Sequence, residues 1–121
     1  MSPLVVAGIG LLGGAGAVLR FLLDGTVSTR FGRALPYGTL AVNVSGSLAL
    51  GVLVGASVAG DASRLVATGL IGAFTTFSTW TFETHRLAED GQLRAGAINV
   101  LVSLALGLLA AWVGRELGGL L

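Results

Sequence analysis

Four long stretches of this chain contain no Asp, Glu, Lys, Arg or His, and they are residues 1–19, 34–60, 65–82 and 95–114. A membrane-spanning helix needs about 17–25 predominantly apolar residues, and each stretch is long enough. Only 11% of the 121 residues are charged, so little of the chain lies outside these stretches. We therefore predict a single-domain, all-α integral membrane protein, a multi-pass bundle with transmembrane helices at about residues 3–23, 36–59, 64–84 and 93–114.

Composition excludes several classes of function. The chain has no cysteine and one histidine, His85, so disulfides, thiol catalysis and thiolate metal sites are excluded. A net charge of +1 without any basic run gives no reason to expect nucleic acid as a partner. No nucleophile–base pair or pair of carboxylates falls within a predicted span, so we do not expect an enzyme.

The third stretch is a poor helix former. Residues 69–82 contain four threonines, a serine and two glycines. These residues lower helix propensity, and their hydroxyls compete for backbone partners. We expect a break in this helix near residues 72–79. An unpaired backbone group costs several kcal/mol in hydrocarbon, so such a break must be buried in protein or line a polar path.

A polar stripe follows one face of the second span, because Thr39, Asn43 and Ser47 recur every four residues. Asn43 is the sharpest candidate for a functional residue, since a carboxamide in hydrocarbon must find partners and its amide offers two donors. Hydrogen bonding between helices is the alternative role for Asn43. In the fourth span, Asn99 and Ser103 also lie four residues apart, where packing ties are the favoured interpretation.

Arg20 ends the first span and has two open interpretations. Its side chain either extends to the membrane interface, paired with Asp24 one turn later, or supplies a vestibule charge that attracts anions. Small residues spaced by four also predict close helix contacts at two places, Gly10 with Gly14 and Gly51 with Gly55.

Three motifs carry a resemblance to a known family. They are Gly-Gly-x-Gly-Ala-x-x-Arg-Phe from residue 13, Pro-Tyr-Gly-Thr-Leu-x-Val-Asn-x-x-Gly from residue 36, and Gly-x-x-Gly-x-x-Thr-Thr-Phe-Ser-Thr from residue 69. With four spans, this chain resembles the CrcB/Fluc fluoride channel family over nearly its whole length. The resemblance implies a passive, fluoride-selective channel of the plasma membrane that lowers cytoplasmic fluoride. It also implies an antiparallel, dual-topology dimer, with the broken third helices crossing at its centre.

The resemblance also implies roles for individual residues. It assigns the fluoride pore to Thr39, Asn43, Phe77, Ser78 and Trp80, and a vestibule to Arg20. The family usually has phenylalanine where this chain has Trp80. A structural sodium ion at the centre of the dimer would be held by the main-chain carbonyls of Gly72 and Thr75. Carbonyls released by a broken helix suit such a hard cation.

Arginines are unevenly distributed between the two predicted sides of the membrane, with Arg20, Arg30, Arg33, Arg86 and Arg94 on one side and Arg64 and Arg115 on the other. The positive-inside rule would place both termini outside. A homodimer and a heterodimer with an oppositely oriented paralogue both stay open. Two other functions remain as alternatives: a proton-coupled exporter of the small multidrug-resistance type, disfavoured because no span interior carries a carboxylate, and a non-transporting assembly subunit.

Overall fold

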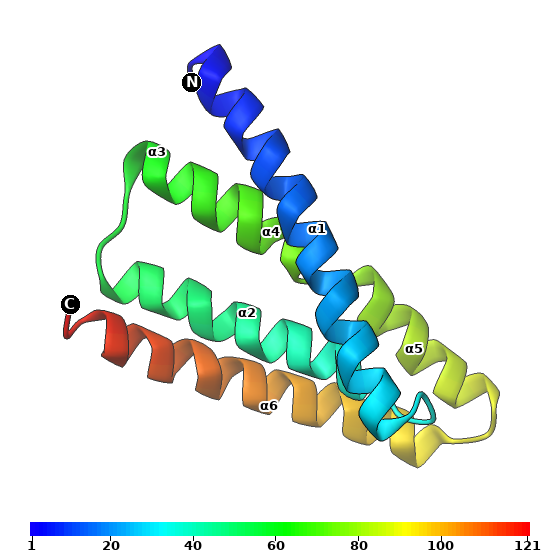
Figure 1. The fold of residues 1–121 in the computed structure, drawn as a ribbon. Helices are drawn as coiled ribbons and strands as arrows, with labels where there is room; N and C mark the ends of the chain where they lie inside the picture. Colours follow the sequence, from blue (N-terminus) through cyan, green and yellow to red (C-terminus); the bar gives the residue numbers. More distant parts are fainter.

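The computed structural model describes all residues, Met1–Leu121, and contains only helices (Figure 1). The first two spans are α1 (Pro3–Phe31) and α2 (Tyr37–Gly55). The third span is divided into α3 (Gly60–Ser63), the π-helix η1 (Arg64–Ile71), α4 (Gly72–Phe74) and α5 (Ser78–Glu89). The fourth span is α6 (Leu93–Gly118). The all-α prediction and the four helices of membrane-spanning length and composition are confirmed.

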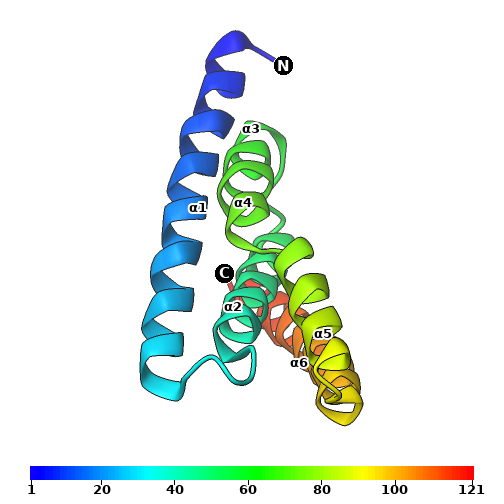
Figure 2. The ribbon, with the colours of Figure 1, turned by 90° about the vertical axis from the view of Figure 1, so that its right-hand side faces the viewer.

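The third span changes its packing partner at the break. Before the break, η1 and α4 lie along α1; after it, α5 packs against α6, and Figures 1 and 2 show this divergence from two directions. Both termini and the turn between α2 and α3 lie at one end of the bundle, and the α1–α2 and α5–α6 connections lie at the other (Figure 1). The break therefore falls in the middle of the molecule.

Glycines bring α2 and α6 into backbone contact. A β-carbon at Gly51 or Gly55 would overlap the carbonyl oxygens of Ala111 and Arg115, respectively. In the same way, Gly114 of α6 lies against the carbonyl of Leu48. The close contact predicted at Gly51 and Gly55 is confirmed.

Gly10 and Gly14 make no close helix contact within this chain, because nothing lies within 4 Å of a β-carbon at either position. The glycine face of α1 that contacts η1 and α4 is a neighbouring one. There Gly8 meets the side chain of Leu65, and Gly16 meets the carbonyl of Leu70. A spacing of four identifies small residues on one face, but it does not identify the face that is packed.

Two boundaries differ from the prediction. The first span, expected to end near residue 23, continues as helix to Phe31, and within this extension Thr26 and Thr29 donate to carbonyls four residues earlier. Helix α2 ends at Gly55 and not near residue 59, because Ser57 adopts the left-handed conformation with φ 57°. Ser57 N–H then bonds to Val54 C=O and Val58 N–H to Leu53 C=O, the hydrogen bonds of a Schellman motif.

The protomer has almost no apolar core of its own. Its buried hydrophobic residues are Val42, Ile71 and Leu87, whereas most of its leucines and several of its aromatic residues are exposed. Apolar side chains on the outside of four membrane-length helices face lipid or another membrane protein. The exposed surface is therefore that of a membrane bundle.

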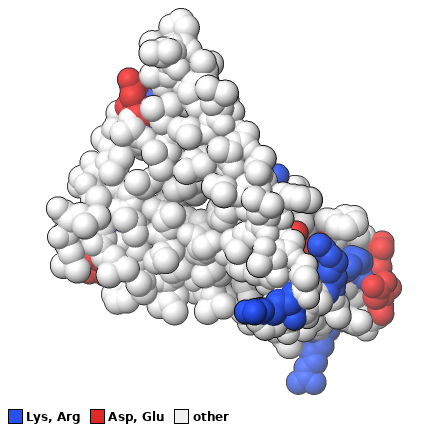
Figure 3. Space-filling model, in the orientation of Figure 1, with Lys and Arg blue, Asp and Glu red and all other residues white.

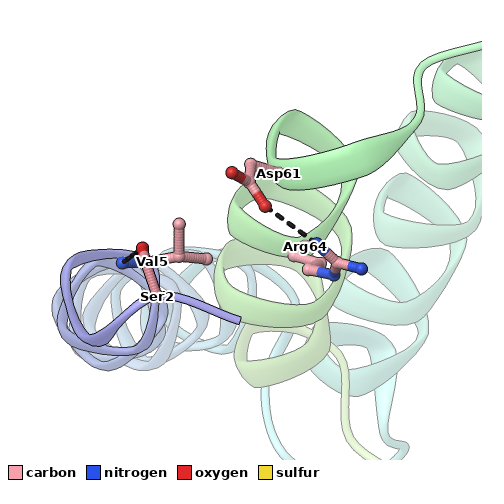
Figure 4. Close-up of polar contacts among 4 residues, drawn as sticks. All are labelled: Ser2, Val5, Asp61 and Arg64. Carbon is pink, nitrogen blue, oxygen red and sulfur yellow. Dashed lines mark hydrogen bonds and ion pairs between the residues drawn. The ribbon is translucent and has the colours of Figure 1, made fainter.

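On the face drawn in Figure 3, most of the charged side chains lie near the two ends of the bundle. Basic side chains gather where α1 ends and α5 turns into α6, and there Arg86 donates to the carbonyl of Arg33. At the end with the N-terminus, Arg64 pairs with Asp61 at 2.8 Å, and Ser2 caps α1 by accepting from Val5 N–H (Figure 4).

Candidate functional site

The third span breaks where the sequence predicted it. Residues 75–77 are not helical, and Thr75 is extended, with φ −78° and ψ 160°. The N–H and the hydroxyl of Thr75 both donate to the C=O of Ile71, the last residue of η1, at 3.0 and 3.1 Å. These two bonds cap the C-terminal end of α4. The preceding π-helix is an uncommon element that is found often at functional sites.

Asn43 of α2 hydrogen-bonds to the main chain at the break. Its Nδ2 donates to Thr76 C=O at 2.8 Å, and its Oδ1 accepts from Thr76 N–H, also at 2.8 Å. The carboxamide thus pairs with both polar groups of one peptide residue, as a neighbouring β-strand would. This arrangement satisfies backbone groups that the break would otherwise leave unpaired. Asn43 therefore bonds between helices, and one of its two amide protons remains for another partner.

The main-chain carbonyls of Gly72 and Thr75, at the break, accept no hydrogen bond within the chain. These are the residues to which the family resemblance assigns the sodium ion. The described chain has no cluster of three or more His, Cys, Asp or Glu side chains for a metal. Uncharged oxygen ligands suit a hard monovalent cation, so the carbonyls at the break fit sodium by their chemistry.

A cavity of about 320 Å³ lies beside the break. Its wall includes Asn43, Ser47, Thr76, Phe77 and Trp80, together with Gly72 and Thr75. The rings of Phe77 and Trp80 are 5.5 Å apart, tilted by 56°. The indole nitrogen of Trp80 is covered by other atoms and has no hydrogen-bond partner, so Trp80 reaches the cavity with its ring and not with its N–H.

A second cavity, of about 230 Å³, is lined by Arg20, Asp24 and Thr39 together with Thr76 and Thr79. Arg20 and Asp24 form no ion pair; Asp24 accepts instead from the Ser28 hydroxyl at 3.3 Å. The pairing that would explain Arg20 as an interface residue is therefore absent. Thr76 lines both cavities, so the break lies between them.

Glu83 is a residue of the site that the sequence analysis missed. Thr39 is buried, with 2% of its surface exposed, and its hydroxyl donates to Glu83 Oε1 on α5. The polar stripe of α2 thus continues onto the third span through two side-chain bonds, Thr39 to Glu83 and Asn43 to Thr76. In the sequence, the only indication of this role is that Glu83 directly follows an uncharged stretch and lies one helical turn after Thr79.

The polar pair of α6 ties that helix to α5. Asn99 Nδ2 donates to the Thr84 hydroxyl at 2.9 Å, and the Ser103 hydroxyl contacts Asn99 Oδ1 at 3.5 Å. Thr84 in turn donates to the carbonyl of Trp80 at 2.8 Å. These contacts are the packing ties favoured from the sequence, and they anchor α5 just after the break.

The structure brings the predicted pore residues together around Thr76. Asn43, Phe77 and Trp80 share the larger cavity, and Thr39 and Arg20 share the smaller one. Ser78 lines neither cavity; it is exposed, with its hydroxyl 3.4 Å from that of Thr76.

Comparison with known proteins agrees with this arrangement. A family profile described as CrcB-like protein, Camphor Resistance (CrcB), matches residues 7–115. The chain belongs to this family. The match covers all four spans except the ends of α1 and α6, which makes the chain a multi-pass membrane protein.

Three relatives illustrate the similarity to the family. A protein of Mycolicibacterium paratuberculosis named fluoride-specific ion channel FluC 2 is 49% identical over 96% of this chain and 95% of its own length. One of Mycobacterium bovis with the same name is 51% identical over 89% of this chain and 86% of its own length. The fluoride-specific ion channel FluC of Syntrophotalea carbinolica is 44% identical over 88% and 90%.

Proposed function

We propose that this protein is a passive, fluoride-selective channel of the plasma membrane that lets cytoplasmic fluoride leave down its electrochemical gradient. The names of its relatives support this function, and they give no support to a proton-coupled exporter or an assembly subunit. The structural observation that carries the proposal is the cavity at the break, where Asn43, Phe77 and Trp80 meet in the middle of the bundle. No step requires a bond to be made or broken, so the protein is a channel and not an enzyme.

Fluoride is a small anion that must exchange water for close donors when it enters a narrow path. In this proposal the free amide proton of Asn43 and the hydroxyl of Ser78 supply hydrogen bonds. The rings of Phe77 and Trp80 supply their positive edges. Thr39 lines the path as a polar residue but does not donate to fluoride, because its hydroxyl already donates to Glu83. Arg20 attracts the anion to the smaller cavity.

A second copy of the chain completes the path. Phe77 is 75% exposed, and the carbonyls of Gly72 and Thr75 have no partner. Such a polar break cannot face lipid, where each unpaired group costs several kcal/mol. An antiparallel dimer that crosses at this point covers it. A structural sodium ion held by the Gly72 and Thr75 carbonyls of both copies would supply the positive charge there.

The partner copy is either the same chain or a paralogue. Several relatives have numbered names, FluC 1 or FluC 2, which supports the existence of paired genes. Because the chain has no cysteine, Asp90→Cys at the exposed α5–α6 turn creates a unique label site. A homodimer of dual topology predicts that an impermeant maleimide labels about half of the chains from outside the cell. Labelling from one side only would instead indicate a heterodimer.

The proposed function is tested by fluoride efflux from liposomes that contain the purified protein, with Phe77→Ile and Phe82→Ile compared. Both side chains are exposed aromatics of the third span, but only Phe77 lines the cavity. Phe77→Ile should reduce fluoride efflux at least tenfold, whereas Phe82→Ile should stay within about twofold of the original protein. Equal efflux through both variants would contradict the role of the cavity.

A further inference from the structure

The unpaired carbonyls of Gly72 and Thr75 have a common origin in displaced hydrogen bonds. In a continuous α-helix, Gly72 C=O would accept from Thr76 N–H, and Thr75 C=O would accept from Thr79 N–H. In this structure both N–H groups have side-chain acceptors instead. Thr76 N–H donates to Asn43 Oδ1 at 2.8 Å, and Thr79 N–H donates to Thr76 Oγ1 at 3.2 Å.

We propose that Asn43 Oδ1 and Thr76 Oγ1 are the positioning groups of the cation site, because each removes the helical partner of one carbonyl and leaves that oxygen free for sodium. This inference rests on the sodium ion of the proposed function and deepens it. Asn43 and Thr76 do not touch the ion in this account; they act through the carbonyls of Gly72 and Thr75.

The role of the Thr76 hydroxyl can be tested separately from that of Asn43. Thr76 is buried, with 9% of its surface exposed, and its main-chain groups alone hold the bond to Asn43. Removing only the hydroxyl therefore leaves both hydrogen bonds between Asn43 and Thr76 in place. The N–H of Thr79 would then lack an acceptor and return to Thr75 C=O, which closes one carbonyl to the ion.

The experiment follows thermal unfolding of the purified protein in detergent while sodium chloride replaces choline chloride. A protein that binds sodium only when folded gains stability as sodium rises, and the concentration for half of that gain reports affinity. Thr76→Val is isosteric and lacks the hydroxyl, and it should need at least tenfold more sodium. Thr76→Ser keeps the hydroxyl and should match the original protein within about twofold.

A third variant tests whether the N–H of Thr79 is the group that blocks the carbonyl of Thr75. Proline lacks an N–H and is tolerated in the first turn of a helix, where Thr79 lies. In the double variant Thr76→Val with Thr79→Pro, no N–H can return to Thr75 C=O. The double variant should therefore recover the sodium response that Thr76→Val has lost.

Unchanged sodium dependence in Thr76→Val would overturn the proposal, and so would absence of any sodium response in the original protein. Neither result would bear on fluoride efflux in liposomes, so failure of the cation site is distinguishable from failure of the channel. A loss in Thr76→Ser equal to that in Thr76→Val would assign the effect to the methyl packing of Thr76 and also overturn the proposal.

Discussion

Asn43 and Thr76 are joined by two hydrogen bonds of 2.8 Å, one from the amide of Asn43 to the carbonyl of Thr76 and one in the reverse sense from the peptide N–H. A single side chain of α2 thereby replaces two helical bonds of the third span. The polar stripe predicted from the sequence is the element that permits the helix to break within the membrane.

Asn43→Ala should lower the thermal stability of the protein, because it leaves both polar groups of Thr76 unpaired. Each unsatisfied buried group costs about 1–3 kcal/mol, so the loss for the two groups is about 2–6 kcal/mol. Ser45→Ala is a matched control, since Ser45 bonds only to carbonyls of its own helix, Ala41 and Val42. Equal unfolding midpoints for the two variants, measured in detergent, would show that the Asn43 clamp does not stabilise the fold.

Glycine contacts between α2 and α6 predict a second effect on stability. Gly114→Ala places a β-carbon against the Leu48 carbonyl and should destabilise the protein by about 1–3 kcal/mol, because backbone must move. Gly107→Ala, on the same helix, meets only ordinary contact with the Ser47 hydroxyl at 3.8 Å and should be neutral or stabilising. Thermal unfolding of both variants measures the difference, and a neutral Gly114→Ala would rule out the close approach.

Ser57→Gly should stabilise the protein. Ser57 has φ 57° in the turn after α2, whereas the equivalent turn after α5 has Gly91 at φ 76°. A left-handed conformation costs a residue with a side chain about 1–2 kcal/mol, part of which is offset by the greater freedom of glycine in the unfolded chain. We expect a gain of about 0.5–1 kcal/mol. A lower unfolding midpoint for Ser57→Gly would contradict the conformation at this turn.

Arg20→Gln should reduce fluoride efflux several-fold at low ionic strength and much less at high ionic strength. The charge of Arg20 lines the smaller cavity and has no ion-pair partner. Its attraction for an anion is screened as the Debye length falls from about 10 Å at 0.1 M salt to about 3 Å at 1 M. Arg64→Gln is the control, because Arg64 pairs with Asp61 at the other end. A salt-independent loss in Arg20→Gln would indicate a structural role instead.

The break could be located from the sequence because threonines and glycines weaken a helix whatever surrounds it. The partner of Asn43 could not be predicted, since periodicity places a residue on a face and says nothing of what lies opposite. The same limit explains Gly10 and Gly14, whose face of α1 lies open while the neighbouring face packs. The extension of α1 through residues 24–31 was missed because polar residues near a span end are compatible with helix and loop alike.

Glu83 shows a further limit. The span interiors predicted from the sequence contain no carboxylate, which disfavours a proton-coupled exporter, yet Glu83 bonds to the buried Thr39 from within α5. Counting charges along a chain cannot reveal that a residue at the edge of a stretch points back into the bundle. The relatives named as fluoride channels, and not the charge count, are what decide between these functions.

The most direct test of the account compares fluoride and chloride efflux from liposomes that contain only this purified chain. We expect fluoride to leave rapidly and chloride to be retained, because the path past Asn43 and Phe77 offers a few close donors that suit the smaller anion. Chloride that leaves as readily as fluoride would contradict the central claim of a fluoride-selective channel.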